Sequence, residues 1–176
     1  KDRGTIFNAK YLGNDGVIEK FNKKVKKLCV ALAFGGNMQY FPKRKIIINK
    51  ILKIGVDTPP IISKLASFER YSTIGKGSII FQGAYVEYSV NIGDFSIINT
   101  NSTICHDVNI DANVIVSPKS VLLGRSAIGE NSFIGGNVTL GPGVVIGHDC
   151  VIGSGSNVVK DCNKKGTYIG NPAKKI

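Results

Sequence analysis

The sequence predicts a mainly β fold, a parallel β-helix that follows a short α/β unit, and three observations lead to this prediction. The first is an unbroken six-residue period, in which fifteen consecutive hexads each begin with Ile, Leu or Val. The second is that the residue four places after each start is always Ala, Val, Ser or Cys. The third is a strand-like, glycine-turn and helix-like pattern before the repeat. The hexads begin at Ile74, Ile80, Val86, Ile92, Ile98, Ile104, Ile110, Val116, Leu122, Ile128, Ile134, Leu140, Ile146, Ile152 and Val158.

A hexad of this kind is a short strand followed by a turn. We expect the branched aliphatic side chain to point inward and stack on its equivalent in the next coil, and the small residue to fit a crowded corner. Glycine often follows the hexad start, and we expect it to relieve strain in the turn. Three hexads would form one triangular coil of 18 residues, so fifteen hexads predict five coils. Ile62 and Phe68 extend the same phase upstream.

The segment before the repeat reads as half of a doubly wound nucleotide-binding unit. Residues 27–36 predict a buried strand that ends in glycines. Residues 40–55 predict a helix with Gly55 as its C-cap, and residues 56–62 an extended linker because they contain Pro-Pro. In that helix Ile46, Ile47, Ile51 and Ile54 would share one face. We therefore expect a partial α/β unit over residues 1–60, with its first strand and phosphate-binding loop before Lys1, and a β-helix over residues 61–176.

Composition excludes several classes of protein. No run of about 18 apolar residues predicts a membrane span, and no secretory signal opens the sequence. The four cysteines show neither CxxC nor zinc-site spacing, which predicts reduced thiols in a cytoplasmic protein and no metal site. The net charge of +11 favours polyanionic partners, but no aromatic–basic interleaving indicates nucleic-acid binding.

The predicted coil gives the two histidines different surroundings. Residues 18 apart share one face, so His106 would lie in a column with Tyr88, Gly124 and Pro142. Gly124 has no side chain and would leave a groove beside the imidazole, and Asp107 could orient the ring. The alternative, a solvated corner histidine, stays open on these residues alone. His148 falls on a different face and reads as a surface residue.

Cys105 raises a further alternative, a thiol nucleophile beside the histidine. Adjacent residues on an extended segment point apart, so we favour a bystander thiol at Cys105. Cys150 and Cys162 occupy the small-residue position of their hexads and are predicted to lie in the core.

Several stretches of the sequence carry a resemblance to a known family. "NTNSTICHDVNIDANVIVSPKS" (99–120), the hexads after it and the ending "GTYIGNPAKKI" (166–176) resemble the sialic-acid O-acetyltransferases and bacillosamine-pathway N-acetyltransferases, the NeuD/PglD-like sugar acyltransferases. "YLGNDGVIEKF" and "VALAFGG" resemble the later part of that family's nucleotide-sugar-binding domain. The resemblance covers nearly the whole chain and implies a left-handed β-helix.

The resemblance also implies a reaction, the direct transfer of an acetyl group from acetyl-CoA to a sugar amine or hydroxyl. His106 would be the general base, and Asp107 would be the acidic neighbour that supports it. Asn99 would line the acceptor pocket. A homotrimer would form the active sites between subunits, and no metal would take part. The remaining matched positions are Gly124, Gly136, Gly153 and Ser154 for the pantetheine groove, and Gly35 and Gly36 for the nucleotide side.

The sequence departs from the family pattern at one position near the proposed base. Ile115 stands nine residues after His106, where relatives often have a second histidine that contacts the thioester. We expect the acceptor to be a nucleotide-linked amino sugar of the UDP-4-amino-sugar type, as used in glycan biosynthesis. Sugar O-acetylation of the sialic-acid type is the alternative. A non-enzymatic or ice-binding β-helix is disfavoured because no Thr ladder covers one face.

Overall fold

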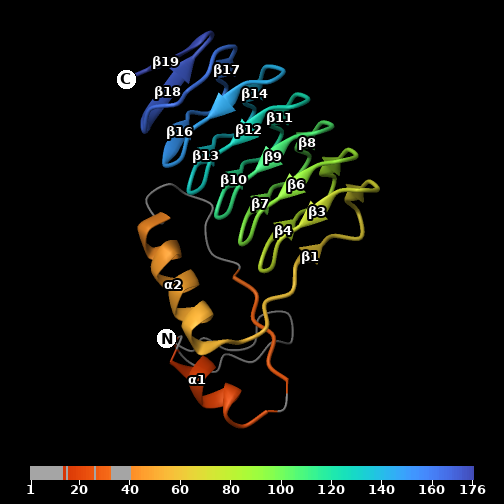
Figure 1. The fold of residues 1–176 in the computed structure, drawn as a ribbon, viewed down its shortest axis with the longest axis vertical. Helices are drawn as coiled ribbons and strands as arrows, with labels where there is room; N and C mark the ends of the chain where they lie inside the picture. The colour runs from red at the N-terminus through yellow and green to blue at the C-terminus, as the bar shows by residue number, and fades with distance from the viewer. Residues whose placement is uncertain (1–13, 15, 26, 33–40) are drawn as a thin grey trace, which may run out of the picture.

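The computed structural model describes residues 14, 16–25, 27–32 and 41–176. Its main body is a parallel β-solenoid of about six turns, with two helices at its N-terminal end (Figure 1). The strands form three flat sheets, which are the three sides of the solenoid. The parallel β-helix predicted from the six-residue period is therefore confirmed.

The three sheets differ in length. The eight-stranded sheet contains, in order, β1 (Ile61–Ile62), β4 (Ile79–Ile80), β7 (Ile97–Ile98), β10 (Ile115–Val116), β13 (Phe133–Ile134), β16 (Cys150–Ile152), β18 (Gly166–Gly170) and β19 (Ala173–Lys175). The six-stranded sheet contains β17 (Asn157–Val158), β14 (Thr139–Leu140), β11 (Val121–Leu122), β8 (Thr103–Ile104), β5 (Tyr85–Val86) and β2 (Ser67–Phe68). The five-stranded sheet contains β15 (Val145–Ile146), β12 (Ala127–Ile128), β9 (Asn109–Ile110), β6 (Asn91–Ile92) and β3 (Thr73–Ile74).

The predicted phase is confirmed at every hexad, because each of the fifteen starting residues is the last residue of a strand. Parallel partners lie 18 residues apart, as Ile104 does from Leu122. The solenoid has about six turns, where five coils were predicted, because strands also end at the upstream positions of the same phase, Ile62 and Phe68. The starting residues from Ile80 to Val158 are buried in one continuous hydrophobic core.

The small residues fill the corners of this core, as predicted. Several are serines, and most of their buried hydroxyls donate to a backbone carbonyl of the next coil, whereas Ser126 Oγ has no hydrogen-bond partner among the described residues. Ser102 Oγ, for example, donates to the carbonyl of Ser117 at 3.0 Å. Cys150 and Cys162 also lie in the core, as predicted. Burial raises the pKa of the Cys162 thiol to about 11.

The explanation that we expected for the glycines is wrong. Positive φ angles occur three residues after the hexad start, where mostly Asn, Asp and other non-glycine residues stand. The frequent glycine one residue after the start has another cause, which is close approach between coils. A Cβ on Gly75 would lie 2.5 Å from the backbone nitrogen of Asp94, and one on Gly129 would lie 2.6 Å from that of His148. Glycine at this position therefore lets successive coils pack closely.

In the part of the chain that the structure describes, two helices precede the solenoid, α1 (Val17–Asn22) and α2 (Phe41–Ile54). The predicted helix over 40–55 is confirmed, with Gly55 at φ 71° donating to the carbonyl of Ile51 at 3.2 Å. The predicted buried face is partly wrong. Ile46 is exposed, and the buried residues of α2 are Arg44, Ile48 and Ile51.

The α/β unit itself is not established by the described residues. Within the predicted strand over 27–36, residues 27–32 hold a single parallel bridge, between Cys29 and Asp57. Gly35 and Gly36 lie outside the described residues. The predicted linker over 56–62 ends within the solenoid, because Ile61 and Ile62 form β1.

Arg44 connects α2 to the solenoid. Its guanidinium is fully buried, and its Nε donates to Asn113 Oδ1 at 2.8 Å. A second guanidinium nitrogen, Nη2, donates to the carbonyl of Phe95. Burial lowers the pKa of Arg44 to about 10, so the group is still charged at neutral pH. Leu32, Ile48, Ile51 and Phe95 form a small apolar cluster beside this contact.

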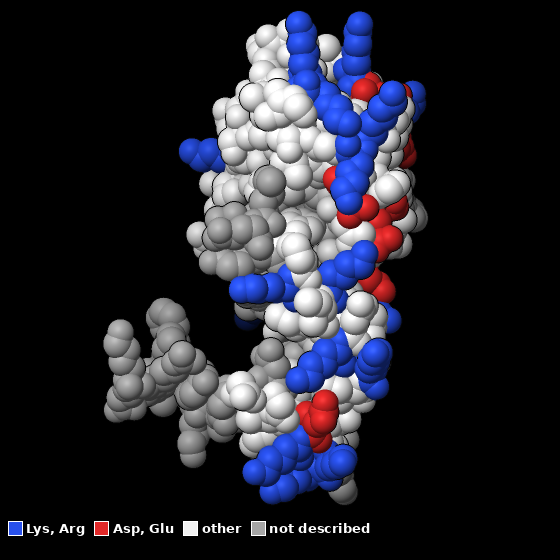
Figure 2. All heavy atoms as spheres, turned by 90° about the vertical axis from the view of Figure 1, so that its left-hand side faces the viewer, with Lys and Arg blue, Asp and Glu red and all other residues white. Residues whose placement is uncertain are grey.

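The far end of the solenoid is closed by a hairpin of β18 and β19. Tyr168 in β18 is buried, and its hydroxyl donates to the carbonyl of Lys164 at 2.6 Å. On the face seen in Figure 2, Lys and Arg side chains gather at this end and again at the helical end, with acidic side chains between them. No helix in the described part of the chain is long and apolar enough to cross a membrane.

Candidate active site

His106 lies at the corner between β8 and β9, on the edge where the six-stranded and five-stranded sheets meet. The ring of Tyr88, one coil earlier, stacks on the imidazole with centroids 5.6 Å apart and planes 11° apart. Gly124, one coil later, leaves the other side free. A Cβ on Gly124 would lie 2.7 Å from both Cε1 and Nε2 of His106. The predicted column is therefore present, and it holds the ring in one plane.

Asp107 fixes the direction of the ring within that plane. Its backbone is in the left-handed region, with φ 59°, and its Oδ2 lies 3.0 Å from His106 Nδ1. A carboxylate at Nδ1 favours the tautomer that carries its proton there, which leaves the lone pair on Nε2. Arg125 Nε lies 4.0 Å from the same carboxylate oxygen. The pair is therefore arranged so that Nε2 can act as a base.

The structure adds one residue that the sequence reasoning missed. Glu87 Oε2 accepts a hydrogen bond from the backbone N–H of His106 at 2.7 Å. Glu87 stands 19 residues before His106, one coil earlier and one residue aside, and that spacing could have identified it. A groove of about 570 Å³ opens here, lined by Glu87, Cys105, His106, Leu123, Gly124, Arg125, Pro142 and Gly143.

Cys105 lines the same groove, so its chemistry bears on the mechanism. Burial, and next the negative charge of Glu87, raise the pKa of the Cys105 thiol. A raised pKa disfavours the thiolate, which is the nucleophilic form. We expect Cys105→Ala to retain turnover within about threefold of the parent, a margin far below the general-base effect. Loss of turnover, together with an acetylated Cys105 detected by mass spectrometry, would favour the thiol mechanism.

Gly124→Ala tests whether the free side of the ring matters. The new methyl group would lie too close to the imidazole, so the ring must rotate away from Asp107 or from Tyr88. We expect kcat to fall about 10- to 100-fold, since small misplacements of a reacting group are costly. The fold should be unaffected, and circular dichroism melting checks this. Neither Gly143→Ala nor Gly136→Ala is a suitable control, because Gly143 has a φ of 68° and Gly136 is itself a predicted pantetheine-groove residue.

The other predicted site residues lie on a different edge. Asn99, Gly136, Gly153 and Ser154 follow β7, β13 and β16, where the eight-stranded and six-stranded sheets meet. Ser154 Oγ accepts from the Gly136 N–H at 3.2 Å. Asn99 Oδ1 accepts from the Thr100 N–H at 2.9 Å. One chain therefore places these four residues together and His106, Asp107 and Gly124 elsewhere, with the width of the six-stranded sheet between them.

Two details of this second edge qualify the predictions. A Cβ on Gly153 would meet the side chain of Ile169 at 2.6 Å, so packing under the C-terminal hairpin explains this glycine. Ile115 was expected in the neighbourhood of His106, and within one chain this is wrong. It belongs to β10 of the eight-stranded sheet and is 0% exposed, whereas His106 follows β8 of the six-stranded sheet.

His148 provides a comparison within the chain. Its Nδ1 lies 2.9 Å from Asp149 Oδ2, much as in the first pair. The hydrogen bond from His148 is the main reason that the pKa of Asp149 is lowered. His148 lies at the corner between β15 and β16, on the third edge, and its side chain is 73% exposed against 38% for His106. The His–Asp dipeptide alone therefore does not define the candidate site.

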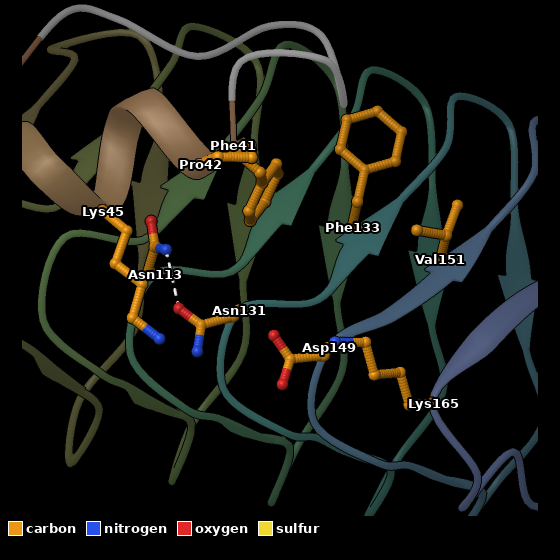
Figure 3. A pocket seen from close by; sticks show the side chains of 9 residues that line it. All are labelled: Phe41, Pro42, Lys45, Asn113, Asn131, Phe133, Asp149, Val151 and Lys165. Carbon is orange, nitrogen blue, oxygen red and sulfur yellow. Dashed lines mark hydrogen bonds between the residues drawn. The ribbon is translucent and has the colours of Figure 1, made fainter.

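A second pocket, of about 390 Å³, lies between α2 and the solenoid (Figure 3). Phe41 and Phe133 meet edge to face there, with centroids 6.1 Å apart. On the other side, Asn113 Nδ2 donates to Asn131 Oδ1 at 2.8 Å. Lys45, Asp149 and Lys165 also line it. Among the described residues, no group of three or more His, Cys, Asp or Glu side chains could hold a metal ion.

Comparisons with known proteins agree with this architecture. The sequence model of the family described as "Bacterial transferase hexapeptide (six repeats)" matches residues 125–160. The acetyltransferase domain of PglB from Neisseria gonorrhoeae, solved also in complex with acetyl coenzyme A, is 27% identical; the match covers 100% of this chain and 84% of that one, with a TM-score of 0.88. PerB from Caulobacter crescentus, in complex with CoA and GDP-perosamine, is 27% identical over 99% of this chain and 82% of that one, with a TM-score of 0.90.

Other comparisons add less. AntD from Bacillus cereus, an N-acyltransferase, is 21% identical over 73% of this chain and 86% of that one, with a TM-score of 0.64, and so shows the fold alone. A search of curated protein sequences found no match. The family match and the first two structures confirm the predicted resemblance to hexapeptide-repeat sugar acyltransferases. They also confirm the prediction that the chain is an acetyltransferase.

Proposed function

We propose that this protein transfers the acetyl group of acetyl-CoA directly to the amino group of a nucleotide-linked amino sugar, with His106 as the general base. The observation that carries the proposal is the ring of His106, held between Tyr88 and Gly124 with Nδ1 on Asp107 and Nε2 facing the groove. Two similar structures support the two substrates, since one contains acetyl-CoA and the other CoA and GDP-perosamine.

The chemistry follows from this geometry. The amine nitrogen attacks the thioester carbonyl carbon, and His106 Nε2 takes the proton that the nitrogen must lose. Asp107 stabilises the imidazolium that forms. The tetrahedral oxyanion collapses, the C–S bond breaks, and the imidazolium returns its proton to the departing CoA sulfur. His106 therefore serves first as base and then as acid, and no acetylated enzyme forms.

The full site in this proposal requires a second copy of the chain. His106, Asp107 and Gly124 would come from one copy, and Asn99, Gly136, Gly153 and Ser154 from the neighbouring copy, because one chain keeps these groups on separate edges. Asn99 would contact the acceptor, and the glycine edge would line the pantetheine chain. The exposed lysines of the C-terminal hairpin, Lys174 and Lys175, would face the CoA phosphates. The homotrimer and the left-handed winding are parts of this proposal.

The acceptor is the second substrate of the proposed reaction. We propose a 4-amino sugar linked to a nucleoside diphosphate, UDP in the first instance, with Gly35 and Gly36 on the nucleotide side. These two glycines lie outside the described residues. Four free thiols agree with a cytoplasmic location.

A substrate panel tests the proposal. Purified protein is incubated with acetyl-CoA and UDP- or GDP-linked 4-amino sugars, alongside the corresponding hydroxyl sugars and sialic acid. Released CoA thiol and product mass are measured. We expect acetylation of at least one amine and of no hydroxyl. Acetylation of hydroxyl sugars alone would favour O-acetylation instead, and a monomer in sedimentation at micromolar concentration would contradict the shared site.

A further inference from the structure

The groove beside His106 carries more negative charge than general-base chemistry requires. Glu87 lines it, in addition to the Asp107 carboxylate that holds His106 Nδ1, and Arg125 is the only cationic side chain among the residues that line it in the described structure. Arg125 is 78% exposed on its side chain and points toward Asp107 rather than Glu87. The Glu87 charge acts within the groove, because it is one cause of the raised pKa of Cys105.

The two oxygens of the Glu87 carboxylate have different surroundings. Oε2 is held by the His106 backbone N–H at 2.7 Å, so the carboxylate is fixed in direction relative to the imidazole. Oε1 accepts no hydrogen bond from the described residues. A fixed carboxylate with one available oxygen beside a base is suited to bind a cation.

We propose that Glu87 makes this site selective for amines, by binding the acceptor as its ammonium ion before His106 acts. This inference rests on the proposed function and extends it, since it names the residue that separates an amino sugar from a hydroxyl sugar. A hydroxyl group carries no positive charge, so it gains no ion-pair attraction from the carboxylate. An amino acceptor at neutral pH is largely protonated and is attracted to Glu87 in a groove that is partly shielded from water.

Protons balance in this scheme. The bound ammonium first releases one proton to solvent and becomes the free amine. The amine then attacks the thioester carbonyl and passes a second proton to His106, which delivers it to the CoA sulfur. The net reaction converts the ammonium sugar and acetyl-CoA to the amide, CoA and one free proton.

Removal of the Glu87 charge should change KM and kcat in different ways. A carboxylate beside the ammonium strengthens capture, but it also favours the charged form, which is not nucleophilic. Loss of the charge should therefore raise KM for the amino sugar and leave kcat unchanged or slightly higher. A purely structural role of Glu87, through its hold on His106, would instead lower kcat.

Three variants separate these roles. Glu87→Gln removes the charge, while its amide oxygen can still accept the His106 N–H. Glu87→Ala removes both. Glu69→Gln is the matched control: Glu69 lies one coil earlier in the same column, but its carboxylate accepts from Ser67 Oγ at 3.1 Å and does not line the groove. Turnover is measured with a UDP-linked 4-amino sugar and with GDP-perosamine. Calorimetry in the presence of CoA compares each amino sugar with its neutral N-acetyl product.

For Glu87→Gln we expect KM to rise on the order of tenfold, the size of one charge-assisted contact in a partly exposed site, with kcat within about threefold. The amino sugar should lose affinity to a similar degree, whereas the N-acetyl product should bind as it does to the parent. Glu69→Gln should match the parent throughout. Glu87→Ala should also lower kcat, because the His106 loop loses its anchor.

Two results would overturn the inference, and they differ from failure of the proposed function. An unchanged KM in Glu87→Gln shows that the charge does not select the amine. Equal loss of affinity for the amino sugar and the N-acetyl product shows a structural role. If the parent protein acetylates neither amino sugar, the proposed function fails, and the inference about Glu87 fails with it.

Discussion

Replacement of His106 by alanine is expected to lower kcat by about 10²- to 10⁴-fold, the usual contribution of a positioned general base. The loss should fall on kcat rather than on the KM for acetyl-CoA, because the imidazole acts on the proton of the attacking group. Stability should change little, since the His106 side chain lies on an edge and is 38% exposed. Steady-state release of CoA thiol, with a thermal melt of each variant, measures both quantities.

The matched control is His148→Ala. This residue has the same partner at nearly the same distance, 2.9 Å from Asp149, but no aromatic ring is stacked on it among the described residues and it lies on another edge. It should retain the activity of the parent. Equal turnover in His106→Ala and the parent rules out His106 as the general base. Loss of turnover in His148→Ala alone would instead place the active site on the edge that holds His148.

Arg44→Ala is expected to release α2 from the solenoid. Removal of the guanidinium leaves Asn113 Oδ1 and the carbonyl of Phe95 without this donor in a buried place. Each lost hydrogen bond to a charged group costs about 1.5–3 kcal/mol, so roughly 3 kcal/mol or more is expected for the pair. The solenoid has its own continuous core and should stay folded. Hydrogen exchange should therefore show loss of protection in α2 with protection retained from β4 to β17.

Two further variants separate the causes. Arg44→Met keeps much of the buried volume but supplies no donor, so it should resemble Arg44→Ala if the hydrogen bonds hold the helix. Lys53→Ala alters an exposed cation in the last turn of the same helix and should leave the exchange pattern unchanged. Protection of α2 that survives in Arg44→Met would show that packing of Ile48 and Ile51, rather than the guanidinium, is what docks the helix.

The solenoid could be predicted from the sequence because its rule is local and repeated. Each hexad buries one aliphatic side chain and one small residue, and a single missing member would have broken the phase. The column around His106 followed directly from the 18-residue coil. The structural role of the glycines could not be predicted in this way, because the pattern shows which positions are glycine and not which atoms they contact. Gly75 is set by the backbone of Asp94 in the next coil, a contact between residues 19 apart.

The rest of the candidate site depends on contacts that have no sequence signal of their own. Glu87 was missed because its importance comes from one hydrogen bond to a backbone N–H in the following coil. Asn99 lies only seven residues from His106, yet the width of the six-stranded sheet separates them. Ile46 fitted the helical period but faces solvent, because Arg44 rather than an isoleucine begins the buried stripe of α2. In each case tertiary contacts outweighed proximity in the chain.

The uniform coil also bears on how such a surface can change over evolutionary time. Each side chain has a fixed angular position around the solenoid axis, and this position repeats every 18 residues. Insertion of a single hexad after Ile110 would keep the core intact but turn every later residue by one edge, which would remove Gly124 and Pro142 from beneath His106. Insertion of three hexads adds one whole coil, so every later residue would keep its angular position and the solenoid would only become longer. Viable length changes near the histidine should therefore come in whole coils, whereas single-hexad changes are tolerated only beyond the groove.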